Sequence, residues 1–131
     1  MTALTWETLL AVAIGGGAGA VLRVAISSGL ARWQARLGHL GWLPVDFPIG
    51  TLLVNVAGSL AIGVLYVALV ERLAASVPLR GLLMAGLLGG FTTFSAFALE
   101  TLRAGAYVAA SIVLCLAACL AGATLMRQIN L

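Results

Sequence analysis

Long uncharged stretches joined by short polar connections dominate this chain of 131 residues. Three of the stretches contain no charged residue, and the first is interrupted only by Arg23. Each stretch is long enough to cross a bilayer, which takes about 20 apolar residues in a helix. The pattern predicts an all-α integral membrane protein with four transmembrane helices. The expected spans are approximately residues 8–30, 47–70, 81–102 and 104–127, within one domain that covers residues 1–131.

The third stretch has an unusual centre, G-G-F-T-T-F-S-A-F, over residues 89–97. Broken backbone at membrane depth is tolerated only where it is buried in protein or lines a cavity. The glycines loosen a helix, and the hydroxyl side chains can bond to the backbone groups that a break would free. We therefore predict that the third helix is interrupted between Gly89 and Ser95. The alternative is a continuous helix that uses Gly86 and Gly90 as a packing face.

Polar side chains in the second and fourth stretches fall at helical spacing. Thr51, Asn55 and Ser59 are four residues apart and share one face of a helix. A buried Asn in a span faces the bundle interior, where it either joins helices or lines a pore. In the fourth stretch, Tyr107 and Ser111 share a face and could complete a polar path.

Two groups of residues in the first and third spans could interact with an anion. Phe94 and Phe97 are three residues apart, and Glu100 follows three residues later. Such a pair usually packs, but the positive edge of a phenyl ring can also hold a small anion. Glu100 either caps the span or ends a polar track. Arg23, near the end of the first span, is either an anchor at the mouth of a watery cavity or an attractor of anions.

Composition strengthens the membrane assignment. The chain is 63% hydrophobic and 8% charged, with a mean hydropathy of +1.16, which is far outside the range of soluble domains. The longest connection, over about residues 31–46, has room for little more than a turn or a short interfacial helix. The first hydrophobic run has no basic region before it and no cleavage site after it, so we expect no removable signal peptide.

The net charge of +3 includes seven basic residues, all of them arginine. With four spans, the termini share one side of the membrane with the second connection. That side holds Arg72, Arg80 and Arg127, and the other holds Arg32, Arg36 and Arg103. The count is three against three, or three against four if Arg23 reaches the interface. Orientation normally follows an excess of Lys and Arg in the cytoplasm. The balance indicates one of two things. Either the chain inserts in both orientations and an antiparallel dimer assembles from the two populations, or a small bias decides a single orientation.

The remaining reactive side chains suggest no chemistry. Cys115 and Cys119 lie four apart on one helical face, where a disulfide is geometrically poor and no metal site is complete, so we expect apolar packing. The single His39 is expected to be a solvated residue of the first connection. No phosphate-binding loop or catalytic cluster is present, so we expect a protein that is not an enzyme.

Three motifs together resemble one known family. They are G-G-x-x-G-A-x-x-R in the first span, G-T-L-x-V-N-x-x-G-S in the second and G-x-x-G-G-F-T-T-F-S-x-F in the third. In this order, and over essentially the whole chain, they resemble the Fluc family of bacterial fluoride channels, also called CrcB proteins. The resemblance implies a dual-topology homodimer of antiparallel subunits that encloses two pores. Such a protein exports toxic fluoride passively from the cytoplasm across the inner membrane.

The resemblance also implies roles for particular residues. Asn55, Phe94 and Phe97 would line the fluoride pathway. An accompanying polar track would contain Thr51, Ser95, Tyr107, Ser111 and Glu100, and Arg23 would lie near the vestibule. A structural sodium ion at the dimer axis would bind backbone carbonyls at Gly89 and Thr92, which suits a hard cation. One departure is Ala96, where many members have a hydroxyl side chain.

A fluoride pore must replace tightly held water with several hydrogen-bond donors while keeping each site shallow. Two other functions remain as alternatives. A small proton-coupled drug antiporter would need a carboxylate deep in the first helix, whereas Glu7 lies at its entrance. A non-conducting subunit of a membrane assembly would leave the polar stripe of the second span unexplained. The sequence does not decide between a homodimer and a pair with a homologous subunit.

Overall fold

The computed structural model describes residues 5–37, 47–94, 97 and 105–129, and every element within these ranges is a helix. The long helices are α1 (Trp6–Leu37), α2 (Ile49–Tyr66) and α6 (Gly105–Gln128). A π-helix, η1 (Val67–Arg72), continues α2. The third hydrophobic segment consists of α3 (Val77–Arg80), the π-helix η2 (Gly81–Leu88) and α4 (Gly89–Phe91).

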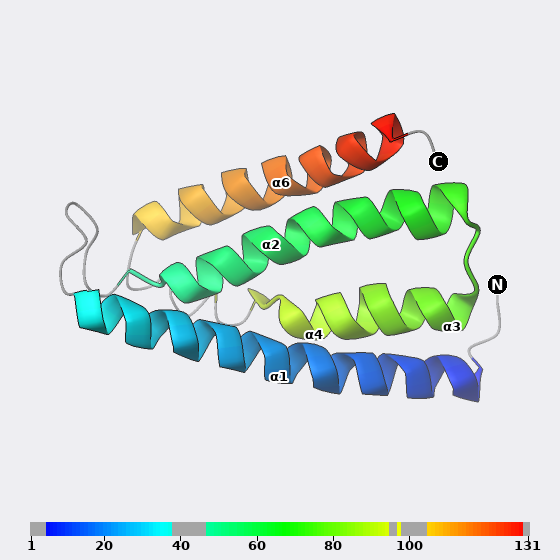
Figure 1. Ribbon diagram of the computed structural model, residues 1–131, viewed down its shortest axis with the longest axis horizontal. Helices are drawn as coiled ribbons and strands as arrows, with labels where there is room; N and C mark the ends of the chain where they lie inside the picture. Colours follow the sequence, from blue (N-terminus) through cyan, green and yellow to red (C-terminus); the bar gives the residue numbers. More distant parts are fainter. Residues whose placement is uncertain (1–4, 38–46, 95–96, 98–104, 130–131) are drawn as a thin grey trace.

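The helices lie side by side, with α2 between α6 on one side and the α1 and α3–α4 layer on the other (Figure 1). Helix α1 packs along η2 and α4 and also contacts α2, while α2 packs along α6. The start of α1, the connection from η1 to α3 and the end of α6 lie at the same end of the bundle (Figure 1). This arrangement places the helix break, at the end of α4, near the middle of the bundle.

Length and composition identify three described helices that can cross a membrane, Trp6–Arg36, Ile49–Arg72 and Val108–Gln128. The third hydrophobic segment contributes a shorter apolar helix, Val77–Phe91. Helix α1 extends through Leu37, beyond the expected end of the first span near residue 30. The all-helical fold class expected from the hydrophobic pattern is therefore confirmed.

Glycines bring α1 against the third segment at backbone contact. A Cβ atom added at Gly15 would overlap the carbonyl oxygen of Leu82 in η2. In the reverse direction, a Cβ atom at Gly90 would overlap the carbonyl oxygen of Gly16 in α1. Small residues at helix interfaces allow this approach in membranes, where association depends on close packing. The packing face predicted for a continuous third helix is thus present, although the helix itself is interrupted.

Local signals explain where the third segment starts. The Ser76 side chain accepts a hydrogen bond from the Leu79 amide at 3.4 Å, and Pro78 occupies the first turn, where its missing amide is tolerated. The eight residues of η2 then form wider turns, in which each amide bonds five residues back. The glycines at 89 and 90 remain helical within α4. The interruption comes after them.

A cluster of polar contacts joins the ends of η1 and α6. Arg127 pairs with Glu71, with Nη2 to Oε1 at 2.6 Å, and Arg72 donates to the carbonyl oxygens of Arg127, at 2.8 Å, and Ile129. Cations near a helix C-terminus satisfy carbonyls that lack helical partners. These contacts close α6 onto the α2–η1 helix at the end that also holds the start of α1.

Candidate functional site

The third helix breaks at Thr92, within the predicted interval. Thr92 has φ −81° and ψ 158°, an extended conformation that turns the next amide away from the helix axis. Both the amide and the hydroxyl of Thr92 donate to the Leu88 carbonyl at 2.9 Å. In an unbroken helix, the Gly89 carbonyl would accept from Thr93. The break removes that helical donor from Gly89.

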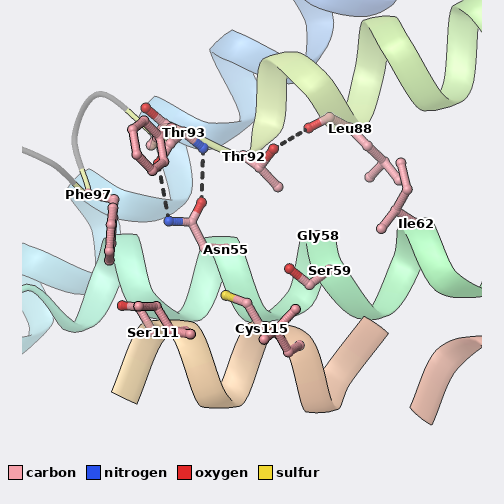
Figure 2. A pocket seen from close by; sticks show the side chains of 13 residues that line it. Asn55, Gly58, Ser59, Ile62, Leu88, Thr92, Thr93, Phe97, Ser111 and Cys115 are labelled. Atoms are coloured by element: carbon pink, nitrogen blue, oxygen red, sulfur yellow. Dashed lines mark hydrogen bonds between the residues drawn. The ribbon is translucent and has the colours of Figure 1, made fainter. Parts of the chain in front are cut away.

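Asn55 of α2 holds the broken segment from the side. Its Oδ1 accepts the Thr93 amide at 2.9 Å, and its Nδ2 donates to the Thr93 carbonyl at 3.3 Å (Figure 2). One side chain therefore satisfies both backbone groups of a residue that has left the helix. Of the two roles left open for Asn55, the structure supports joining helices directly, and the side chain also lines the adjacent cavity.

Space for the break comes from Gly58, one turn after Asn55 on α2. A Cβ atom at Gly58 would overlap the Thr92 methyl group and lie 3.4 Å from the Phe91 ring. Phe91 itself is buried with Val54 and Leu88 in the small core between α2 and the third segment. The G-T-L-x-V-N-x-x-G-S motif of α2 thus supplies both the polar partner of the break and the gap that receives it.

An open cavity of about 410 Å³ lies beside the break, between α2, the end of the third segment and α6 (Figure 2). Most of its wall is apolar, with a few polar groups, a composition typical of small-ligand sites. The lining residues come from all three elements: Asn55, Gly58, Ser59, Ile62, Leu88, Thr92, Thr93, Phe94, Phe97, Ser111, Ile112, Cys115 and Leu116.

The two candidate phenylalanines meet at this cavity. The ring centroids of Phe94 and Phe97 are 5.5 Å apart, with 38° between the ring planes. Phe94 is 79% exposed in the single chain, whereas Phe97 is half-buried. The expected same-face relationship is therefore confirmed. A ring as exposed as Phe94 has most of its edge available to a further molecule or to solvent.

Helix α6 adds Ser111 and Cys115 to the wall. Ser111 is 3% exposed, and its Oγ has no hydrogen-bond partner within the part of the chain that the structure describes. A buried hydroxyl without a partner is costly, which marks this atom as a ligand-binding candidate. Cys115, which was expected to pack in an apolar environment, lies on the mostly apolar cavity wall one turn from Ser111. The four-residue spacing from Ser111 was the signal for this position.

The polar stripe of α2 divides between two cavities. Thr51 does not line the cavity at the break; it lines a second one, also of about 410 Å³, between the end of α1 and the start of α2. In that region, Gln34 donates to the Phe47 carbonyl at 3.1 Å. Thr51 is thus a full turn from Asn55 along α2 and faces a different space. Helical spacing alone had placed the two on one stripe.

Arg23 lies on the face of α1 that packs on the rest of the bundle. Gly19, one turn before it, contacts Leu87 and Phe91, and Ser27, one turn after it, contacts Gly50. Arg23 is half-buried, and its Nε is enclosed with no partner in the described chain. An enclosed guanidinium nitrogen without an acceptor favours an anion or water as the missing partner. The two roles predicted for Arg23 therefore remain open.

Some predicted site residues lie outside the described residues. They are Ser95 and Glu100, together with Ala96, and the Tyr107 side chain is also outside the description. Their predicted roles in the polar track stay predictions. The residues that the structure does bring together are Asn55, Phe94, Phe97 and Ser111.

The cavity can offer hydrogen bonds to an anion. The Asn55 amide has two hydrogens, and the Thr93 carbonyl takes one of them. The second hydrogen has no acceptor among the described residues, and neither does the Ser111 hydroxyl. Together with the positive ring edges of the phenylalanines, these donors could hold a small anion without a full positive charge in the cavity wall.

Comparison with known proteins gives a consistent result. The family described as "CrcB-like protein, Camphor Resistance (CrcB)" matches residues 10–123. Proteins named "Fluoride-specific ion channel FluC" are similar over most of the chain. The one from Rhizobium etli is 43% identical over 129 residues, covering 92% of this chain and 96% of its own length. The one from Coxiella burnetii is 41% identical, covering 89% and 92%.

A third relative with the same name, from Methylococcus capsulatus, is 43% identical over 131 residues. This chain spans only about half of that protein's length, because the match covers 93% of the chain but 54% of the relative. The family match, over residues 10–123, spans the positions of the break and of Asn55. This chain is a multi-pass membrane protein that belongs to the CrcB family.

Proposed function

We propose that this protein is a fluoride-selective channel that exports fluoride passively from the cytoplasm across the bacterial inner membrane. The observation that carries the proposal is the 43% identity to the Rhizobium etli fluoride-specific ion channel over 96% of that protein's length. The names of the relatives denote a channel and not an enzyme. The cavity at the helix break supplies the kind of site that this function requires.

The mechanism follows from the donors of the cavity. Fluoride loses hydration on entering a narrow site, so hydrogen-bond donors must replace water. The second Asn55 amide hydrogen, on α2, and the Ser111 hydroxyl, on α6, do this within one cavity. The phenyl edges of Phe94 and Phe97 add weak positive potential without a strong trap. Chloride is larger and gains less from such donors.

Arg23 is proposed to concentrate anions at the entrance of the pathway. Its guanidinium is half-buried, and its Nε has no acceptor among the described residues. A positive charge in a cleft with low-dielectric walls raises the local concentration of anions. Nε is the enclosed nitrogen, so the other two nitrogens of this guanidinium can bind water or the passing ion. The sites deeper in the cavity then need no full charge.

The functional unit is proposed to be an antiparallel homodimer with two pores. Supporting features are the even distribution of arginine and the 79% exposure of Phe94, an aromatic ring of the proposed site. A test introduces Leu73→Cys, at an exposed connection, into a Cys115→Ser, Cys119→Ser background. Dual topology predicts that a membrane-impermeant maleimide labels about half of the introduced thiols in intact cells. Labelling of all or none would overturn this assignment.

A structural sodium ion is proposed to bind at the break, on backbone carbonyls of Gly89 and Thr92. The break removes the helical donor of the Gly89 carbonyl, and that glycine is exposed on one side of α4. Carbonyl oxygens suit a hard cation, and two copies of the break would supply four of them. Replacing sodium by N-methylglucamine should lower the melting temperature of the purified dimer. An unchanged melting temperature would remove the ion from the proposal.

The function is tested by fluoride efflux from liposomes that contain the purified protein. A fluoride electrode records release, valinomycin with potassium dissipates the membrane potential, and chloride serves as the control anion. We expect rapid fluoride release without chloride release, and a loss of at least tenfold in Phe94→Ile. Trp6→Ile, an aromatic substitution at a position 72% exposed and outside the cavity, should retain the wild-type rate. Well-folded protein that releases no fluoride would refute the proposed function.

A further inference from the structure

A free thiol lies on the wall of the proposed pathway. Cys115 lines the cavity, one helical turn after Ser111, and is half-buried. Figure 2 shows Cys115 on α6, the helix that also carries Ser111, and Asn55 on α2. Cys119, one turn further along, does not line the cavity, and its carbonyl packs against Gly63. The chain therefore contains two similar thiols on one helix, only one of which lines the cavity.

The same part of the wall has a second feature that points to a ligand. Ser111 is 97% buried, because its exposed fraction is 3%, and its hydroxyl finds no partner in the described chain. The cavity volume of about 410 Å³ lies within the range of small-molecule sites, and most of the wall is apolar. A neutral, apolar molecule of the size of one aromatic ring can therefore reach the sulfur and remain in the cavity.

We propose that Cys115 is a modification site for neutral, apolar thiol-reactive compounds and that its modification closes the ion pathway. The closing of the pathway rests on the proposed channel function, whereas the modification of Cys115 does not depend on it. In the reaction with an alkyl thiosulfonate, the thiolate sulfur attacks the sulfenyl sulfur of the reagent. A new S–S bond forms, the bond to the sulfonyl sulfur breaks, and the sulfinate leaves with the electron pair. The thiol proton passes to the buffer.

The location of the adduct explains the block. A ring attached at Cys115 would lie among Asn55, Ser111 and Phe97, which line the same space. It would cover the donors that replace the water of the ion, and it would do so without adding a charge. A pathway that depends on those donors loses conduction when they are covered. The effect is therefore steric and reversible, since reduction of the disulfide releases the ring.

The experiment treats purified wild-type protein with benzyl methanethiosulfonate, followed by peptide mass spectrometry and by fluoride efflux after reconstitution. We expect the benzylthio adduct on Cys115 several-fold more than on Cys119, and at least a tenfold loss of efflux that dithiothreitol restores. Cys115→Ser should show no loss of efflux on treatment. Cys119→Ser, whose side chain is outside the cavity, should be blocked like the wild type.

Other outcomes separate this inference from the proposed function. Preferential labelling of Cys119, or labelling of Cys115 without loss of efflux, would overturn the modification site. Persistent block in the Cys115→Ser variant would also overturn it. If untreated protein carries no fluoride, the channel function fails, and the ratio of the two adducts by mass spectrometry still decides whether Cys115 is the accessible thiol.

Discussion

The contact between Asn55 and Thr93 should contribute measurably to the stability of the fold. Replacing Asn55 with Leu keeps the number and branching of the side-chain heavy atoms but removes the acceptor of the Thr93 amide and the donor to its carbonyl. These two bonds join residues 38 positions apart in the sequence, so the contact is tertiary. The break should therefore lose its fixed position against α2.

The expected magnitude follows from the two distances. The bond to Oδ1, at 2.9 Å, has ordinary length, and such a bond contributes about 1–1.5 kcal/mol net. The bond from Nδ2, at 3.3 Å, is longer, so we assign it about 0.5 kcal/mol. Interhelical hydrogen bonds in membranes contribute similar amounts, about 0.6 kcal/mol on average with a maximum near 1.7. We expect Asn55→Leu to lower the free energy of unfolding by about 2 kcal/mol.

The assay is equilibrium unfolding in mixed micelles with a rising fraction of sodium dodecyl sulfate, followed by tryptophan fluorescence. Thr124→Val is the matched control, because the Thr124 hydroxyl donates only to carbonyls of its own helix, Leu120 and Ala121. It should change the free energy of unfolding by less than about 0.5 kcal/mol. An Asn55→Leu protein within that same margin of wild type would refute the role assigned to Asn55.

Three further substitutions test the packing and the cavity. Gly63→Ala places a Cβ atom against the Cys119 carbonyl, so α2 and α6 must separate at a cost of about 1–3 kcal/mol in the free energy of unfolding. In Gly17→Ala the added Cβ atom meets nothing within 4 Å, so this substitution should instead stabilise α1 by up to about 1 kcal/mol. The same micelle titration measures both, and equal effects would contradict the close approach of α2 and α6. Ser111→Ala removes a buried hydroxyl that has no described partner, so the free energy of unfolding should stay the same or rise by about 1 kcal/mol. Fluoride efflux should fall about tenfold, which corresponds to the loss of one hydrogen bond to the ion. Unchanged efflux in the liposome assay would show that this hydroxyl is not a ligand of the ion.

Much of the site could be predicted because helical spacing and the bilayer restrict what the residues can do. The hydroxyl-rich centre of the third stretch predicted a break, and the structure places it at Thr92. The spacing of Phe94 and Phe97 predicted one shared face, which their ring contact confirms. The glycines at 89 and 90 were assigned to the break itself, but they remain helical, since Gly90 is needed for contact with α1.

Spacing along one helix could not assign residues to cavities. Thr51 and Asn55 share a stripe, yet they line different spaces because the partner helix changes along α2 from the end of α1 to the break. Cys115 was assigned to apolar packing for its residue type, whereas its place on the cavity wall depends on how α6 is rotated about its axis. Rotation is set by the contacts of Gly63 and Gly122 across the α2–α6 interface.

The sequence by itself determined that this chain is a bundle of membrane helices with an interrupted third segment. Hydrocarbon requires each span to satisfy its own backbone, so apolar length and the cluster of glycine and hydroxyl residues are sufficient signals. Only the tertiary structure decided that Asn55 binds both backbone groups of Thr93, and that Ser111 and Cys115 face the same cavity. These relations join residues far apart in sequence, and they depend on helix separation and rotation, which glycine contacts set in three dimensions.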